Sequence, residues 1–251
     1  MITPPQFERT EILIGNTGLT LLAGKHVFVA GLGGVGSYCA EALVRAGVGK
    51  LTLVDHDKVA VSNINRQLPA LLSNVGTAKI ELMRERILNI NPNCILTTHQ
   101  TFLNTENMTK YVPDDADYII DCIDSLNCKV ALIATSLQRG LNIASSMGAG
   151  NRLDPGKIKL ADISKTEMCP LARIIRKRLH RLGIKSGVLT VYSDEQPSQP
   201  LPPVAVDGPG RPRAVNGTIS YMPPLFGLML AGEVIRRLLQ QDTAQNQPSQ
   251  T

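Results

Sequence analysis

The sequence predicts an α/β protein with a Rossmann-like, doubly wound and mostly parallel sheet, helices on both faces, and a C-terminal extension with further strands and a closing helix. Three observations support this fold class. Apolar runs alternate with helical patterns from residue 27 to residue 145, a glycine-rich turn follows the first run, and Asp55 stands about twenty residues beyond the glycines, as in dinucleotide-binding folds. With 251 residues, the chain can also bury a substantial core.

The spacing of apolar residues and the glycine and proline stops define the first ten elements. Because strands and helices alternate, the strands should form a parallel sheet that binds ligands at its carboxyl edge, where Gly31, Asp55 and Asp121 to Asp124 fall. In order, the sequence predicts a lead helix (1–24), a strand (27–30), a helix that begins after the glycine turn and ends at Gly47, a strand (51–54), a helix (79–89), a strand (94–98), a brief helix (104–111), a strand (118–121), a helix (127–139) and a strand (142–145).

Beyond residue 148 the composition changes. A helix that begins at Pro170 has an apolar stripe (171, 174, 175, 179, 182) opposite a basic side (173, 176, 177, 180, 181), and strands are expected at 158–163 and 188–192. Residues 193–215 contain six prolines and predict a mobile loop, and residues 225–239 predict a closing helix. The expected organisation is an N-terminal helical lead (1–24), a nucleotide-binding domain (25–150), an extension of the same fold (151–240) and a disordered tail (241–251).

Charge and cysteine usage narrow the function classes. Residues 165–185 hold seven lysines and arginines against one glutamate, a local charge of +6, so the remainder carries −1 of the +5 total. Such a segment attracts a phosphate backbone, whereas ATP alone would not require it. The five cysteines form no C-x-x-C pair, so neither a disulfide framework nor zinc is expected. Because the chain has no apolar run of about 20 residues and no signal peptide, we expect a cytoplasmic protein without membrane contact.

The glycine turn has the residues that a phosphate site needs. Gly31 permits a tight bend, Gly33 lets backbone N–H groups approach a phosphate, and Gly36 allows the helix to pack close to the strand. The helix N-terminus adds partial positive charge. The segment 55–67 then supplies acids, amides and a cation that an NAD-dependent oxidoreductase has little use for, which makes that class a poor fit.

Four motifs in this region resemble those of the ubiquitin-activating-like superfamily, the adenylating enzymes of the thiamin- and molybdopterin-synthesis type. They occur in family order and at family spacing. They are the glycine turn 31–37, Asp55-x-Asp57-x-Val59-x-x-Ser62-Asn63-x-Asn65-Arg66-Gln67, Gly76-x-x-Lys79, and Asp121-x-x-Asp124.

The resemblance implies an adenylation site for ATP and Mg²⁺. Asp124 is implied to hold Mg²⁺, with Arg66 and Lys79 on the phosphates. Arg9 would reach across a homodimer interface into the neighbouring site. These four residues form the expected catalytic set, and the expected ATP-binding set comprises Gly31, Gly33, Gly34, Gly36, Asp55, Asp57, Asn63, Arg66, Gln67, Lys79 and Asp121.

Simpler structural roles remain open for several of these residues. Asp55 could cap its loop, Lys79 could be a solvated helix residue, and Arg66 could pair with Asp57. Arg9 could be an ordinary surface arginine. Asp121 could support the loop that follows it instead of touching ATP.

Residues 145–149, 161–166 and 222–224 resemble one branch of this superfamily, which dehydrates threonylcarbamoyladenosine in tRNA to its cyclic form. This resemblance implies that the threonyl carboxylate is adenylated and then attacked by its own carbamoyl group, with release of AMP. It also gives the basic helix a role in binding tRNA. The expected tRNA-binding residues are Arg173, Arg176, Lys177, Arg181 and Lys185.

Two alternatives belong to other function classes. The same branch would have an acidic residue before Pro170, but this chain has Cys169 there. The chain could instead activate a ubiquitin-like sulfur carrier and transfer it through this thiol. A sulfur-relay protein would then be a possible partner. A tRNA-binding module without activity is a weaker alternative, because it would not need both Arg66 and Lys79.

Overall fold

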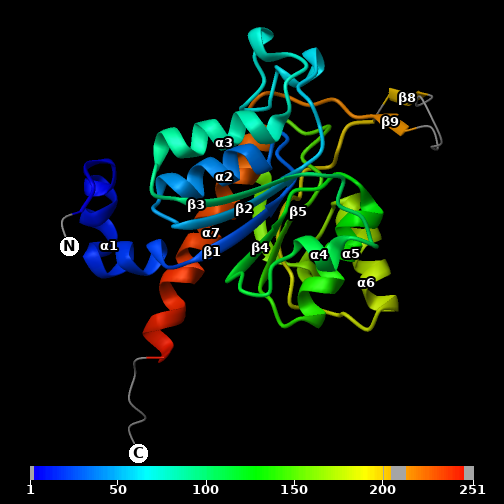
Figure 1. Cartoon of the computed structure of the whole chain (residues 1–251). Coiled ribbons are helices and arrows are strands. Elements are labelled where there is room, and N and C mark those ends of the chain that lie inside the picture. The colour runs from blue at the N-terminus through cyan, green and yellow to red at the C-terminus, as the bar shows by residue number, and fades with distance from the viewer. Residues whose placement is uncertain (1–2, 200, 205–212, 246–251) are drawn as a thin grey trace, which may run out of the picture.

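A seven-stranded sheet runs through the centre of the protein, shown in Figure 1 as a computed structural model that describes residues 3–199, 201–204 and 213–245. The strand order is β3-β2-β1-β4-β5-β7-β6. Every neighbouring pair is parallel except β6 and β7, which are antiparallel. The sheet therefore confirms the predicted mostly parallel, doubly wound fold. Its strands are β1 (His26–Ala30), β2 (Lys50–Asp55), β3 (Ile95–Gln100), β4 (Tyr118–Asp121), β5 (Ile143–Ser146), β6 (Ile158–Asp162) and β7 (Leu189–Ser193).

Seven α-helices in the described part of the chain connect and cover these strands. The lead helix α1 has a kink at Gly15, whose φ of 70° is non-helical. Short 3-10 turns lie at Pro5–Phe7, Val61–Asn63, Leu72–Asn74, Pro155–Lys157 and Ile163–Lys165. The helices are α1 (Glu8–Ala23), α2 (Gly36–Arg45), α3 (Lys79–Ile90), α4 (Met108–Tyr111), α5 (Leu126–Gln138), α6 (Pro170–Arg181) and α7 (Met222–Gln245).

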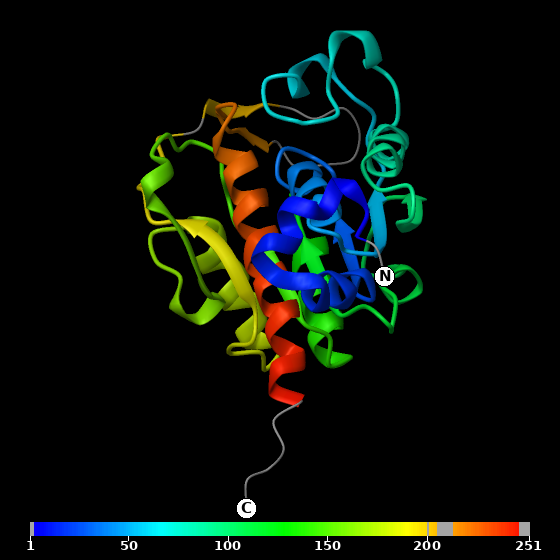
Figure 2. The same ribbon diagram turned by 90° about the vertical axis from the view of Figure 1, so that its left-hand side faces the viewer.

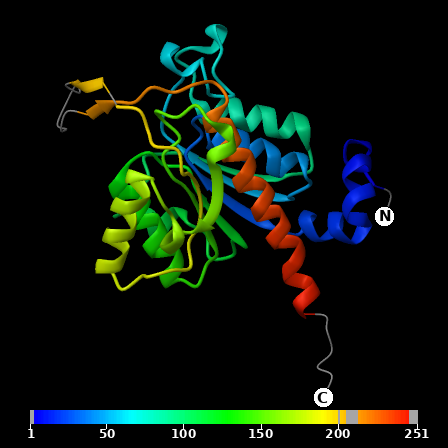
Figure 3. The ribbon, with the colours of Figure 1, turned by 180° about the vertical axis from the view of Figure 1, so that it is seen from behind.

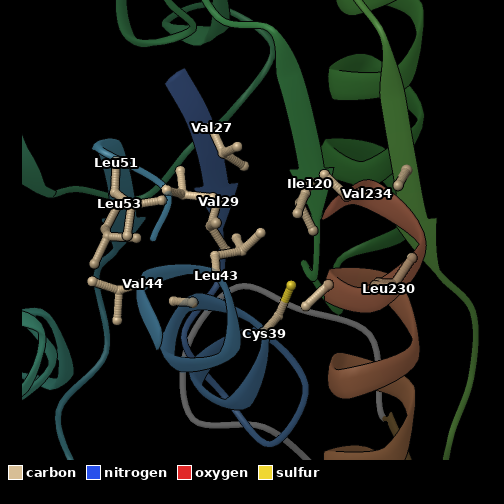
Figure 4. Packing of buried hydrophobic residues seen from close by; sticks show 14 of the residues in the cluster. Val27, Val29, Cys39, Leu43, Val44, Leu51, Leu53, Ile120, Leu230 and Val234 are labelled. Atoms are coloured by element: carbon tan, nitrogen blue, oxygen red, sulfur yellow. The ribbon is translucent and has the colours of Figure 1, made fainter. Parts of the chain in front are cut away.

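The two faces of the sheet bury two separate apolar clusters. Along β1, Val27 and Val29 belong to the cluster that α2, α3 and α7 cover, whereas Phe28 and Ala30 belong to the cluster under α4, α5 and α6. This alternation follows from the period of two residues in a strand. Figure 4 shows the first cluster, with side chains from β1, β2 and α2 meeting those of α7. Figures 2 and 3 show α7 crossing this face from the carboxyl edge of the sheet past its amino edge.

Most expected elements are present, with ends shifted by one or two residues, although the lead helix expected at 1–24 is helical only over Glu8–Ala23 after a 3-10 turn. The brief helix is shorter than expected, because only residues 108–111 are helical, and the closing helix is longer at both ends. The proline-rich segment also contains two antiparallel strands, β8 (Leu201–Val204) and β9 (Arg213–Val215), which the sequence did not predict. Residues 200 and 205–212 of that expected loop, and 246–251 of the expected tail, lie outside the described residues. Among the described residues, no helix is long and apolar enough to span a membrane.

Candidate active site

A cleft of about 340 Å³ lies at the carboxyl edge of the sheet. The ends of β1, β2, β4 and β5 form its floor, and residues 216–223 reach it from far along the chain. Parallel sheets bind ligands at this edge because the chain reverses direction there and leaves a crevice. Eight of the expected site residues line this cleft: Gly31, Gly33, Gly34, Asp55, Asp57, Arg66, Lys79 and Asp124.

The glycine turn forms the floor of the cleft. Gly31 has a φ of 89°, which disfavours any residue with a Cβ, and its backbone packs against the carbonyl of Cys122. A Cβ at Gly36, the first residue of α2, would overlap the carbonyl oxygen of Gly31. Gly36 therefore does not line the cleft but permits the close approach of α2. The residues just before α2, Gly33 to Val35, consequently line the cleft at the positive end of the helix dipole.

Asp55 is fixed in place at the end of β2. Its Oδ2 accepts a hydrogen bond from the N–H of Leu32 at 2.5 Å, and its Oδ1 accepts one from the N–H of Asp57 at 2.7 Å. Burial raises the pKa of Asp55, although these two backbone hydrogen bonds oppose the shift. Asp55 therefore does cap its loop, and it also lines the cleft with the carboxylate held rigidly.

Lys79 is a buried cation and not a solvated helix residue. It is the first residue of α3 and is 3% exposed. Its Nζ lies 2.8 Å from Oδ2 of Asp57, and its backbone N–H donates to the carbonyl of Asp57 at 3.0 Å. Asp57 is half-exposed and also contacts Nε2 of His56 at 3.2 Å. The ion pair thus holds the ammonium group at the wall of the cleft.

Arg66 pairs with no carboxylate in the described part of the chain. Its Nη1 donates to the carbonyl of Ser62 and to Oδ1 of Asn65, each at 2.9 Å, so it does not pair with Asp57. The adjacent Gln67 is 8% exposed, and its buried Oε1 has no hydrogen-bond partner among the described residues. Asn63 does not line the cleft, because its Oδ1 accepts from the N–H of Ala60 and closes a short turn.

Asp124 presents an exposed carboxylate to the cleft. It has no hydrogen-bond or ion-pair partner among the residues that the structure describes. A second group of possible metal ligands lies at the other wall, where the side-chain ligand atoms of Asp55, His56 and Asp57 are within 4.8 Å of one another. The two sets of oxygens are the kind that Mg²⁺ prefers.

Asp121 differs from the expected ATP contact, because it is fully buried and does not line the cleft. Its Oδ2 lies 2.7 Å from Nζ of Lys129 and accepts from Oγ of Ser145 at 2.6 Å. Its Oδ1 accepts from the N–H of Ile123 at 3.0 Å. Lys129, which is 1% exposed, also donates to the carbonyl of Ser146 at 2.9 Å. Asp121 therefore supports the loop that carries Asp124, which was its alternative role.

Sequence reasoning missed Lys129, although one signal was present. It lies on the same side of α5 as Leu132, Ile133 and Ser136, which are all buried. A charged residue in such a stripe needs a buried partner of opposite charge. The other missed residues also line the cleft: Phe102, Met147, Gly150, Leu171, Asn216, Thr218 and Pro223.

The basic helix α6 begins at the cleft, where Leu171 forms part of the wall. Arg173, Lys177, Arg181 and Lys185 are exposed, as a surface for RNA requires. Arg176 is half-buried instead, and its Nη1 donates to the carbonyls of Ile163 and Thr166 and to Oγ1 of Thr166. It is therefore engaged locally. Within the expected apolar stripe, Ile174 and Leu182 are also exposed, at 43% and 54%.

Two further expected residues lie away from this cleft. Arg9 is exposed on α1, and α1 leads into the amino end of β1, at the edge of the sheet opposite the cleft (Figure 1). Arg9 therefore does not reach the cleft of its own chain. Cys169 is 4% exposed and belongs to the apolar cluster under α6, so its thiol is not accessible to a carrier protein.

Comparisons with known proteins agree with this geometry. The ThiF family matches residues 7–251. The tRNA threonylcarbamoyladenosine dehydratase of Bacillus subtilis (strain 168) is 40% identical over 240 residues, covering 93% of this chain and 94% of that protein. The enzyme of the same name from Escherichia coli (strain K12) is 37% identical over 250 residues, covering 93% of each. A crystal structure of the E. coli dehydratase in complex with ATP superimposes with a TM-score of 0.86 at 35% identity, covering 98% of this chain and 100% of that chain.

Proposed function

Because this chain belongs to the ThiF family, and because one cleft gathers the glycine turn, Asp55, Lys79, Arg66 and Asp124, we propose that it is an ATP-dependent tRNA threonylcarbamoyladenosine dehydratase. It adenylates the threonyl carboxylate of N6-threonylcarbamoyladenosine in tRNA and closes the activated group to a ring. The grouping of two cations with a free carboxylate beside a phosphate-binding turn is the observation that carries this proposal.

ATP binds with its phosphates over the glycine turn. The N–H groups of the turn bind phosphate oxygens, and the partial positive charge at the N-terminus of α2 favours them. Lys79 and Arg66 supply two full charges from either side. Gln67 does not line the cleft, and its side-chain amide lies beside Gly33, so it supports the glycine turn. Asp55, as an acceptor at the end of β2, suits the ribose hydroxyls.

Asp124 would hold Mg²⁺, because it is exposed, lines the same cleft as Lys79 and has no partner among the described residues. Asp57 is the other suitable carboxylate, although Lys79 already occupies one of its oxygens. When bound, Mg²⁺ neutralises charge on the phosphate oxygens. Asp121 and Lys129 contribute indirectly by holding the loop of Asp124 in place.

The chemistry needs two steps. A carboxylate oxygen of the threonyl group attacks the α-phosphorus of ATP, the bond to the β-phosphate oxygen breaks, and pyrophosphate leaves. The carbamoyl group of the same nucleoside then attacks the activated carbonyl carbon and expels AMP. Lys79 and Arg66 stabilise the charge that develops on the phosphates in the first step. The second step is intramolecular, so proximity promotes it and no enzyme thiol is needed.

The buried position of Cys169 argues against the alternative in which a carrier protein is transferred through this thiol. For Cys169→Ser we expect unchanged activity, whereas Asp124→Asn should abolish AMP release. The assay is incubation of tRNA bearing threonylcarbamoyladenosine with ATP, followed by mass analysis of the nucleosides. Loss of activity in Cys169→Ser, with a folded protein, would favour the alternative.

The exposed basic residues of α6 bind the phosphate backbone of the tRNA near the modified nucleoside. Arg173, Lys177 and Arg181 are spaced four residues apart, so they lie along one line of the helix, which leads away from the cleft. Replacing all three with glutamine should weaken tRNA binding and flatten its salt dependence. Arg236→Gln, which removes an exposed charge on α7, is the control.

The active form is a homodimer in which Arg9 completes the site of the partner. Two observations support a dimer. Arg9 is exposed and lies away from the cleft of its own chain. The same helix also exposes the apolar side chains of Ile12 and Leu13. The test is to mix Arg9→Gln with Asp124→Asn. Each is expected to be inactive alone, and the mixture should recover about a quarter of the wild-type rate, because random exchange gives half of the molecules as hybrids with one intact site each. No recovery after subunit exchange would contradict the role across the interface.

A further inference from the structure

Arg152 is a buried cation that takes no part in the proposed adenylation. It is 4% exposed and follows the segment 148–150, which lines the cleft. Its Nη1 donates to the carbonyls of Gly148 and Gly150, and its Nε donates to the carbonyl of Glu195 at 3.3 Å. All three acceptors are neutral oxygens of the backbone.

The charge of Arg152 is uncompensated in the described part of the chain. No carboxylate oxygen there lies within 4.0 Å of its guanidinium group, and its buried Nη2 has no hydrogen-bond partner. The carboxylate of Glu195 accepts from the N–H groups of Leu153 and Asp154 instead. Burying an unpaired charge is costly, so a protein has little structural reason to keep one. A neutral residue could bond the same carbonyls.

The position of Arg152 indicates what its charge serves. The carbonyls that it binds belong to Gly148 and Gly150, and both residues form the cleft wall together with Asn216 and Thr218. In the proposed function the glycine turn, Lys79 and Arg66 bind the phosphates, which leaves the wall at residues 148–150 to the acyl substrate. Arg152 therefore places a buried positive charge behind the wall at residues 148–150.

We propose that Arg152 is a specificity-determining residue that selects the anionic form of the acyl substrate, by fixing the wall at residues 148–150 and by attracting the carboxylate that is to be adenylated. This inference rests on the proposed function. A phosphate of the RNA is another anion that the same charge could attract, and the two sources give different results in the following experiment.

The experiment measures the dissociation constants of two tRNAs, one bearing threonylcarbamoyladenosine and one lacking the modification, for the wild type, Arg152→Gln and Arg152→Lys. The wild type should bind the modified tRNA at least about ten-fold more tightly than the unmodified tRNA, and this ratio of affinities is the quantity compared. In Arg152→Gln this ratio should fall close to one, while the affinity for unmodified tRNA and for ATP stays the same. Arg152→Lys should keep most of the preference, because it keeps the charge.

An unchanged affinity ratio in Arg152→Gln would overturn the inference. An equal loss of affinity for both tRNAs would also overturn it and would identify a phosphate as the anion. So would a ratio near one in a folded Arg152→Lys variant. If Arg152→Gln does not fold, wild-type protein can be tested with modified tRNA whose carboxylate is converted to its methyl ester. Wild type that binds the ester as tightly as the acid would also refute the proposal. Failure of the proposed function is a separate result, because wild type would then form no cyclic product from the modified tRNA.

Discussion

Lys129→Met tests how the carboxyl ends of β4 and β5 are held together. The substitution removes a buried ammonium group but keeps most of the volume of the side chain. It leaves Asp121, which is 0% exposed, without a counter-ion, and it removes the donor to the carbonyl of Ser146. Breaking one partner out of a buried ion pair costs about 3–5 kcal/mol, since the remaining charge stays desolvated. The free energy of unfolding should fall by this amount.

The assay is urea unfolding followed by circular dichroism, with the free energy obtained by linear extrapolation. The matched variant is Asp121→Asn combined with Lys129→Met, which removes both charges and should recover at least 1 kcal/mol relative to Lys129→Met alone. Lys110→Met, at an exposed position of α4, is the surface control. A loss of less than about 1 kcal/mol in Lys129→Met, or a double variant no more stable than the single one, would refute the reasoning.

Three further predictions concern the glycine turn, a cleft cation and a buried histidine. Gly36→Ala should abolish ATP binding, measured by calorimetry, because the added Cβ would overlap the carbonyl oxygen of Gly31. The control is Gly232→Ala on α7, where no atom lies near the added Cβ, and it should bind ATP normally. Lys79→Met should lower the rate of adenylation at least 100-fold. It should cost much less stability than Lys129→Met, since its partner Asp57 is half-exposed and can be hydrated. An equal loss of stability in the two variants would contradict this. Burial lowers the pKa of His26, so the folded protein favours the neutral imidazole. The stabilisation that the neutral imidazole gives is present above pH 6.5 and is lost as the pH falls below that value. Stability measured between pH 7.5 and 5.5 should therefore fall less in His26→Gln than in the wild type, and an unchanged slope would exclude His26 as the cause.

The fold was predictable from the sequence because its signals are local. The run before Gly31, the glycines themselves and the acid at the end of the second strand lie within one short stretch of chain, and each is fixed by the period of a strand or by the space that a Cβ needs. The ends of β4 agreed with the prediction for the same reason, as an apolar run ends abruptly on Asp121.

The parts of the site that could not be predicted depend on contacts between distant segments. Asp121 could have faced the cleft or the interior, and the choice is decided by Lys129 on α5 and Ser145 on β5. Arg176 looked equivalent to its neighbours on α6, but the turn at Thr166 accepts its hydrogen bonds. The burial of Arg152 likewise depends on the chain near Glu195. None of these partners has a fixed sequence spacing from the residue that it binds.

The central claim is that the cations and the free carboxylate at the carboxyl edge of the sheet adenylate the carboxylate of a modified tRNA. Exchange of labelled pyrophosphate into ATP by the purified protein tests it most directly, with three possible acyl substrates: tRNA bearing threonylcarbamoyladenosine, the same tRNA without the modification, and a ubiquitin-like carrier ending in Gly-Gly. We predict exchange with the modified tRNA alone, and its loss in Asp124→Asn. Exchange with the carrier and not with the modified tRNA would contradict the assignment.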